Sequence, residues 1–200
     1  GFSPTSIIDV GAFEGNWTRT VRKVWNAPVL MVEPQLSKVA ALRQVARELH
    51  DISLCQDPLS DVAGRTLPFF EMETGSSLKP ENSNVARLVT ERTTESLDNV
   101  AGHLSGPMFL KLDVQGAELD VLRGGEQVLS ACELVQLEVA LLPYNEGAPT
   151  FLETMLFMDS RDFVPLDISG FARPNGVDLV QTDILFCRKG SSLRPTSFRF

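Results

Sequence analysis

The run Ile7-Ile8-Asp9-Val10-Gly11-Ala12-Phe13-Glu14-Gly15 constrains the fold more than any other part of this chain. Apolar residues with high β propensity surround Asp9, which predicts a short buried strand. Gly11 and Gly15 then predict a tight turn into a helix that begins near Asn16. A strand, a glycine turn and a helix in this order build a nucleotide-type cofactor site at the carboxyl end of a first parallel strand.

The residues of this turn indicate which cofactor it binds. A dinucleotide turn follows the pattern G-x-G-x-x-G, whose middle glycine lets the backbone approach a pyrophosphate. Here Ala12 and Phe13 stand in the middle, and acidic residues flank the turn, which disfavours a diphosphate and favours a cation such as the sulfonium of S-adenosylmethionine. The other interpretation is a turn whose glycines serve the structure alone. The predicted cofactor contacts are Asp9, Gly11, Ala12, Phe13, Glu14 and Gly15.

The rest of the chain alternates strand and helix patterns, which is typical of a parallel α/β sheet. Seven strands that end in a hairpin-like pair favour a methyltransferase-like (Rossmann-like) fold over a six-stranded dinucleotide fold, with a mostly parallel seven-stranded sheet, a terminal antiparallel strand and helices on both faces. Segments 66–72 and 85–92 are extended but interrupt the alternation. The predicted strands are 6–10, 29–33, 52–55, 108–114, 134–140, 163–168 and 180–187, and the predicted helices are 16–25, 37–49, 96–104, 117–129 and 150–160.

Composition limits the classes of protein that the chain can represent. Its 200 residues, 43% hydrophobic and 22% charged, predict one globular domain over 1–200, with a tail of different composition at 189–200 that is compatible with flexibility. The net charge of −8 argues against a duplex nucleic-acid partner. No apolar run is long enough to span a membrane. Cys55, Cys132 and Cys187 show no metal-binding spacing, so we expect no metal site and a reducing, cytoplasmic setting.

Polar residues follow the second and third predicted strands. Glu33 ends the second strand, where a carboxylate is placed to accept hydrogen bonds from both ribose hydroxyls of a nucleoside. Pro34 stops that strand and fixes the turn that follows. Gln56 and Asp57 follow the third strand, and they either bind the amino edge of an adenine ring or serve as turn residues. We therefore add these four residues to the predicted cofactor site.

A second informative block runs from Phe109 to Gly125. Strand alternation places Phe109, Lys111 and Asp113 on one face, with Asp113 at the carboxyl end of the strand, where open α/β sheets bind ligands. We predict that Asp113 binds the amino group of the cofactor or the reacting hydroxyl. Glu118 falls in the first turn of the following helix, where its charge also suits the helix dipole.

At this point the chain resembles the FkbM-type methyltransferases. That family carries a lysine-x-aspartate-x-(glutamate or glutamine)-glycine-alanine-glutamate run, and the match extends over Leu110–Gly125. Shorter runs, including Ile8–Ala12 and Val32–Pro34, resemble its first two motifs. The resemblance implies a class I, S-adenosylmethionine-dependent fold and O-methylation of a hydroxyl. It also implies cofactor contacts at Asp9, Gly11 and Glu33, with Asp113 near the methyl group.

The acceptor of the methyl group is expected to be a small molecule or a carbohydrate. Asp113 is the first candidate for the base or aligning group, and Glu138, at the end of the fifth predicted strand, is the second. Tyr144 and Asn145 lie on a loop bounded by proline and glycine, a setting that commonly positions substrates. We assign these two residues and Gln115 to substrate binding.

Two other hypotheses remain at the level of sequence. The first is a cofactor-binding or scaffold protein with a methyltransferase fold and no transfer activity. It is motivated by Gln115, which stands where many family members have glutamate, and by a first strand that begins within a few residues of Gly1. The second is a nicotinamide-dependent enzyme acting on sugars, against which the missing middle glycine counts.

Overall fold

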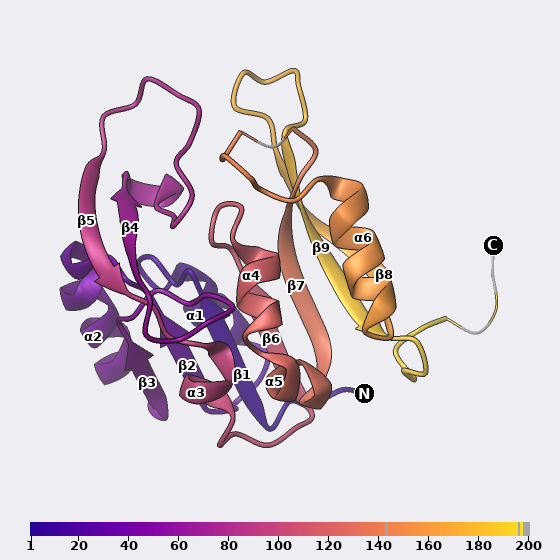
Figure 1. The fold of residues 1–200 in the computed structure, drawn as a ribbon. Coiled ribbons are helices and arrows are strands. Elements are labelled where there is room, and N and C mark those ends of the chain that lie inside the picture. The colour runs from indigo at the N-terminus through magenta and orange to yellow at the C-terminus, as the bar shows by residue number, and fades with distance from the viewer. Residues whose placement is uncertain (143, 196, 198–200) are drawn as a thin grey trace.

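Seven strands form one sheet in the order β3-β2-β1-β6-β7-β9-β8 (Figure 1). The computed structural model describes residues 1–142, 144–195 and 197. Strand β9 runs antiparallel to both of its neighbours, and the other pairings are parallel. The expected class I methyltransferase-like fold is therefore confirmed. The strands of the sheet are β1 (Ser6–Val10), β2 (Val29–Val32), β3 (Ile52–Cys55), β6 (Met108–Leu112), β7 (Cys132–Ala140), β8 (Phe163–Ala172) and β9 (Gln181–Arg188).

Helices cover both faces of the sheet. Alternating side chains of β1 show why both faces need cover, because Ile7 packs into one apolar cluster and Ile8 into the other. Helices α1 and α2 cover the face of Ile7, and α3 to α6 cover the face of Ile8 (Figure 1). The helices are α1 (Asn16–Val21), α2 (Val39–Glu48), α3 (Leu97–Ala101), α4 (Glu118–Arg123), α5 (Glu126–Ala131) and α6 (Phe151–Ser160), with 3-10 turns η1 (Leu36–Lys38) and η2 (Glu73–Gly75).

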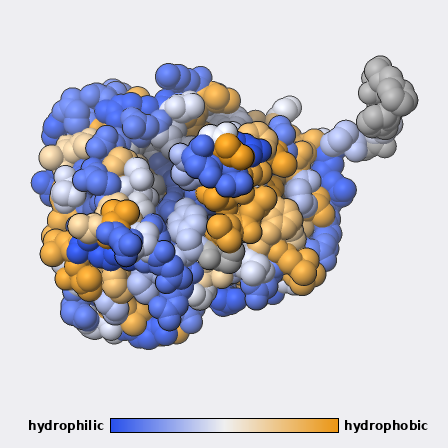
Figure 2. All heavy atoms as spheres, turned by 90° about the horizontal axis from the view of Figure 1, so that it is seen from above, coloured by the Kyte–Doolittle hydropathy of each residue, from blue (hydrophilic) through white to orange (hydrophobic). Residues whose placement is uncertain are grey.

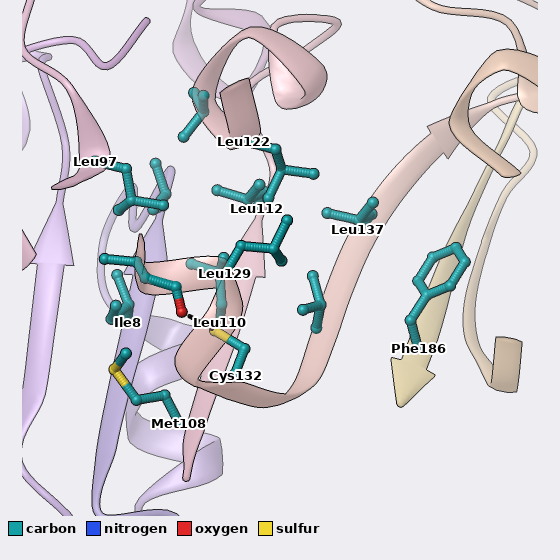
Figure 3. Packing of buried hydrophobic residues seen from close by; sticks show 14 of the residues in the cluster. Ile8, Leu97, Met108, Leu110, Leu112, Leu122, Leu129, Cys132, Leu137 and Phe186 are labelled. Carbon is teal, nitrogen blue, oxygen red and sulfur yellow. Dashed lines mark hydrogen bonds between the residues drawn. The ribbon is translucent and has the colours of Figure 1, made fainter. Parts of the chain in front are cut away.

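The larger cluster is built from the middle of the sheet. Leu110, Leu112 and Leu137 are fully buried beneath α4 and α5, whose Leu122 and Leu129 pack onto them (Figure 3). Burying one leucine side chain of this kind contributes about 2 kcal/mol to the free energy of unfolding. This packing fixes the positions of β6 and β7, and it therefore also positions the residues that follow at their carboxyl ends.

The expected helix 117–129 is wrong in one respect, because the chain forms two helices there. Gly124 and Gly125 separate α4 from α5, and both lie against other parts of the chain. A Cβ atom on Gly124 would lie 2.2 Å from the carbonyl oxygen of Ser60, and one on Gly125 would lie 2.6 Å from a methyl group of Leu97. The glycines therefore allow a close approach of backbone to neighbouring elements that a continuous helix of larger residues would prevent.

The extended segments that interrupt the alternation form a separate sheet. Strands β4 (Thr66–Glu71) and β5 (Leu88–Thr93) pair antiparallel with each other and not with the main sheet. Arg92 attaches this small sheet to the site, since its guanidinium donates to the carbonyls of Pro34 (2.5 Å) and Gln56 (2.6 Å). It therefore fixes the chain just beyond β2 and β3.

Loops from several elements gather at the carboxyl ends of the parallel strands. Figure 2 looks down on this edge, where hydrophilic residues surround a hollow near the middle of the face and apolar residues gather to its right. Pro143, and residues 196 and 198–200 of the expected tail, lie outside the described residues. None of the helices that the structure describes is long and apolar enough to cross a membrane.

Candidate active site

A cavity of about 250 Å³ opens at the carboxyl ends of β1, β2 and β6. The turn after β1 and the loop after η2 both line it. The cavity has polar and apolar walls, as small-molecule sites usually do. It is lined by Val10 to Glu14, Asn16, Trp17, Val32 to Gln35, Pro58, Leu59, Phe69, Thr74, Ser76 to Leu78, Lys111, Asp113, Val114, Ala117, Gln136 and Asp183.

The turn after β1 needs glycine at its first position. Gly11 has a φ of +76°, and a Cβ atom there would lie 1.8 Å from the carbonyl oxygen of Asp113. The amides of Gly11 and Ala12 both donate to the carbonyl of Val32 (2.9 and 3.1 Å). Phe13 adopts a φ of +50°, which is uncommon for a residue with a side chain. The turn is therefore pinned between β2 and β6, with Ala12 and Phe13 on the cavity wall.

Glu33 is held by the backbone on either side of its carboxylate. Its Oε2 accepts from the amide of Phe13 (2.8 Å), and its Oε1 accepts from the amide of Gln35 (2.9 Å). The side chain is almost fully buried yet lines the cavity. Burial raises the pKa of Glu33, and the two amides partly offset that rise. Each oxygen keeps a further lone pair, so the carboxylate can accept two more hydrogen bonds from a diol.

Asp9 lies behind the cavity and not on its wall. It is fully buried, accepts from the hydroxyl of Thr18 (2.7 Å) and pairs with the ammonium of Lys111 (3.2 Å). Its charge is therefore neutralised within the protein, so Asp9 orders the site from behind. Gly15 also lies away from the cavity, because it packs against Val45 of α2 at a φ of +75°. Glu14, which is also predicted in this turn, lines the cavity together with Gly11, Ala12 and Phe13.

Lys111 joins β1 to the end of β6. Its ammonium donates to the carbonyl of Gly11 (2.8 Å) and lies 3.6 Å from Asp113. Burial by itself would lower the pKa of Lys111, but Asp9 and Asp113 together outweigh burial and raise it. The lysine therefore stays charged and holds the Asp113 carboxylate at the cavity wall.

Asp113 and Glu138 are connected by one amide. The Nε2 of Gln115 donates to Asp113 Oδ1 (2.8 Å) and to Glu138 Oε2 (2.6 Å), and Gln181 donates to the same oxygen of Glu138 (2.8 Å). Burial raises the pKa of Glu138 strongly, and neighbouring Asp113 and Glu118 raise it further. Gln115 is itself buried, at a φ of +55°. Among the described residues, Asp113 lines the cavity whereas Gln115 and Glu138 lie beside it.

Glu118 serves the turn between β6 and α4. Its carboxylate accepts from the amides of Val114 (3.0 Å) and Gly116 (3.1 and 3.2 Å). Burial raises the pKa of Glu118 to about 7, against the opposing effect of these amides. The position at the helix start agrees with the sequence, but the carboxylate caps the turn from inside the protein.

Other predicted residues lie apart from the cavity. Tyr144 and Asn145 line a separate small hollow together with Glu138. Asn145 is buried and donates to the carbonyl of Lys79 (3.1 Å), so it joins two loops. Gln56 meets Arg92 through its carbonyl, and neither it nor Asp57 lines the cavity in the part of the chain that the structure describes. Their ligand contacts stay predictions, whereas Pro34 does line the cavity.

The structure adds residues that sequence reasoning did not select. Lys111 carried a signal, since it lies on β6 and precedes Asp113, the residue just after that strand, by two positions. Trp17, Gln136 and Asp183 carried none, because each lies on an element whose relation to the cavity depends on the folded sheet. Lys38 lies at the rim, where its ammonium is 4.0 Å from the centre of the Phe13 ring.

Residues 9–165 match the family model of the methyltransferase FkbM domain. The chain belongs to the FkbM methyltransferase family. The resemblance identified from the motifs is thus confirmed over more than half of the sequence. The comparison with curated protein sequences returns no match.

Solved structures similar to this FkbM-family protein include methyltransferases. An rRNA methylase from Streptococcus thermophilus has a TM-score of 0.52 at 13% identity, over 92% of this chain and 86% of that one. Magnesium protoporphyrin IX methyltransferase from Synechocystis, with bound SAM, has a TM-score of 0.51 at 10% identity, over 91% and 69%. A 1,6-didemethyltoxoflavin-N1-methyltransferase from Burkholderia thailandensis has a TM-score of 0.52 at 11% identity, over 93% of this chain and 72% of that one. At these identities the similarity concerns the fold.

Proposed function

We propose that this protein is an S-adenosylmethionine-dependent O-methyltransferase that acts on a hydroxyl of a small molecule or carbohydrate. The observation that carries the proposal is the buried Glu33 carboxylate, whose oxygens are each held by one backbone amide and still face the cavity. A ribose diol fits such a carboxylate. Structures with the same fold support this choice, because they contain SAM or S-adenosylhomocysteine.

The cofactor would lie along the turn after β1 in this proposal. Gly11 and Ala12 offer a close backbone approach, Phe13 and Pro34 offer apolar cover, and Glu33 receives the ribose. S-adenosylmethionine supplies a methyl group already activated by a sulfonium. The protein then needs to bind, align and deprotonate the acceptor.

Asp113 is the group best placed for the proton of the acceptor hydroxyl. It lines the cavity, whereas Glu138 is reached from it through Gln115. Lys111 lies 3.6 Å from the Asp113 carboxylate and holds it at the cavity wall. The new C–O bond would form as the methyl–sulfur bond of S-adenosylmethionine breaks, with S-adenosylhomocysteine as the leaving group. The hydroxyl proton would pass to Asp113, and Glu138 would stay a partner in the same network.

The same proposal includes the setting of the protein. Three cysteines are unpaired, Cys55, Cys132 and Cys187, which agrees with a reducing, cytoplasmic environment. Residues 1–200 would act as one catalytic domain, with no duplex nucleic acid as partner.

Calorimetry with S-adenosylmethionine tests the cofactor first. Wild type should bind, and Glu33→Ala should bind about ten- to a hundredfold more weakly, since a hydrogen bond to a charged acceptor contributes about 1.5–3 kcal/mol. Absence of heat from folded wild type would refute the proposal. Binding without methylation across a broad panel of hydroxyl acceptors would favour the non-catalytic hypothesis, and loss of turnover in Asp113→Ala would exclude it.

A further inference from the structure

One carboxylate on the cavity wall has no partner in the part of the chain that the structure describes. Asp183 of β9 lines the cavity, is partly buried, and makes no side-chain hydrogen bond or ion pair with another described residue. Lys111, the single cation among the described lining residues, is already paired with Asp9 and Asp113. Asp183 therefore keeps its capacity to accept hydrogen bonds for whatever enters the cavity.

The neighbouring strand makes room for this side chain. Gly170 of β8 stands opposite Asp183 in the pairing with β9, and a Cβ atom there would lie 2.1 Å from Asp183 Oδ2. The hydroxyl of Thr182 donates to the carbonyl of Gly170 (2.8 Å) and holds the two strands together at this point. The carboxylate thus occupies a place that a larger residue in β8 would fill.

Gln136 and Trp17 complete this side of the cavity. The indole Nε1 of Trp17 donates to Gln136 Oε1 (3.2 Å), which orients the amide and leaves its Nε2 without a partner among the described residues. The Trp17 ring packs edge-on against Phe109, with centroids 5.3 Å apart. An amide donor, a carboxylate acceptor and an indole therefore meet at one end of the cavity, and Glu33 lies on its β2 side.

We propose that Asp183, with Gln136 and Trp17, forms the acceptor subsite and selects acceptors that present hydroxyl or ammonium donors over anionic acceptors. This inference rests on the proposed function, since it assigns the side of the cavity with Glu33 to the cofactor. An acceptor with a phosphate or carboxylate at this place would meet Asp183 and Asp113, and the lysine nearby is already paired. Asp183 lies beyond residues 9–165, so the family match says nothing about it.

Two cofactor analogues test the subsite without a known acceptor. Sinefungin carries an amino group in place of the transferable methyl group, whereas S-adenosylhomocysteine carries nothing there. In calorimetry, Asp183→Asn should weaken sinefungin about tenfold or more, because its ammonium loses a charged partner, and should change S-adenosylhomocysteine less than about twofold. Gly170→Ala, which displaces the carboxylate, should shift the same ratio in the same direction.

The control is Asp167→Asn, the same substitution at an exposed position of β8 whose side chain bonds its own strand. It should leave both affinities unchanged. An unchanged ratio of the two affinities in Asp183→Asn would overturn the subsite, whether both affinities are retained or both fall by the same factor. An equal fall would indicate a role in cofactor binding or folding. If folded wild type binds neither analogue, the proposed function fails. If wild type binds both analogues and Asp183→Asn leaves their ratio unchanged, only the subsite fails.

Discussion

The two ends of the cavity are built in different ways. At the proposed cofactor end, the stretch from Gly11 to Gln35 supplies the turn and the Glu33 carboxylate, and backbone amides hold both. At the proposed acceptor end, the carboxylates of Asp113, just after β6, and Glu138 of β7 share the amide of Gln115. Asp183 of β9 has no side-chain partner among the described residues, and Glu118 of α4 lies buried beside Glu138. Backbone geometry therefore governs the first end, and the balance of buried charge governs the second.

The largest effect is expected where the two ends touch. Gly11→Ala places a Cβ atom 1.8 Å from the Asp113 carbonyl oxygen at a φ of +76°, so it should lower the free energy of unfolding by roughly 4 kcal/mol or more. Gly64→Ala is the matched control, because Gly64 has a similar φ of +80° with nothing within 4 Å, and should cost about 1 kcal/mol. Chemical denaturation measures both. Equal losses would show that the contact between the two ends is unimportant.

The second effect belongs to the acceptor end and depends on pH. The pKa of Glu118 is raised from 4.5 to about 7 in the folded protein, so its stabilising contribution is complete below pH 4.5 and is lost as the pH rises through 7. Relative to Glu118→Gln, wild type should therefore lose about 3 kcal/mol of unfolding free energy across that range. Denaturation at several pH values measures the difference.

Exposed Glu91 provides the control for this pH dependence. Glu91→Gln, on β5 and away from the acceptor end, should follow the wild-type curve. A Glu118→Gln curve parallel to wild type would contradict the assignment of buried charge to this end.

The smallest effect is expected at the rim of the cofactor end. Lys38 pairs with Glu73 (2.7 Å) and Glu14 (3.3 Å) and lies over the Phe13 ring, so it ties the loop of η2 to the turn after β1. Lys38→Met should speed the dissociation of S-adenosylmethionine about two- to fivefold, because such exposed ion pairs contribute at most about 1 kcal/mol. Stopped-flow tryptophan fluorescence measures the rate. The control is Lys23→Met at an exposed position, which should leave the dissociation rate unchanged. Equal dissociation rates in the two variants would show that Lys38 does not connect the η2 loop to the turn after β1.

Local patterns predicted the elements well where they depend on neighbouring residues. Strands 6–10 and 52–55 were predicted with the bounds that the structure has, since apolar β-forming residues stand between clear turn signals. The break between α4 and α5 was missed because Gly124 and Gly125 are explained by contacts with Ser60 and Leu97, which are distant in sequence. The separate sheet of β4 and β5 was missed for a similar reason, since the local pattern of a strand does not specify which other strand it pairs with.

The site divides along the same line. The glycine turn, Glu33 and Asp113 were identified from the sequence, because each follows a strand whose carboxyl end is marked by local pattern, and the structure places all three on the cavity. The burial of Asp9 against Lys111 and the link from Asp113 through Gln115 to Glu138 were not accessible in this way. Both depend on which strands lie side by side.

The order of residues therefore specified the family, the fold and the turn and carboxylate of the proposed cofactor end, since these follow from strand, turn and helix signals within short stretches of chain. Only the folded sheet brought Trp17, Gln136 and Asp183 together, over a separation of 166 positions between the first and last, and aligned Gly170 with the Asp183 carboxylate. Side-chain charges act over a few ångströms in space whatever their distance along the chain, so the acceptor end was decided by tertiary structure.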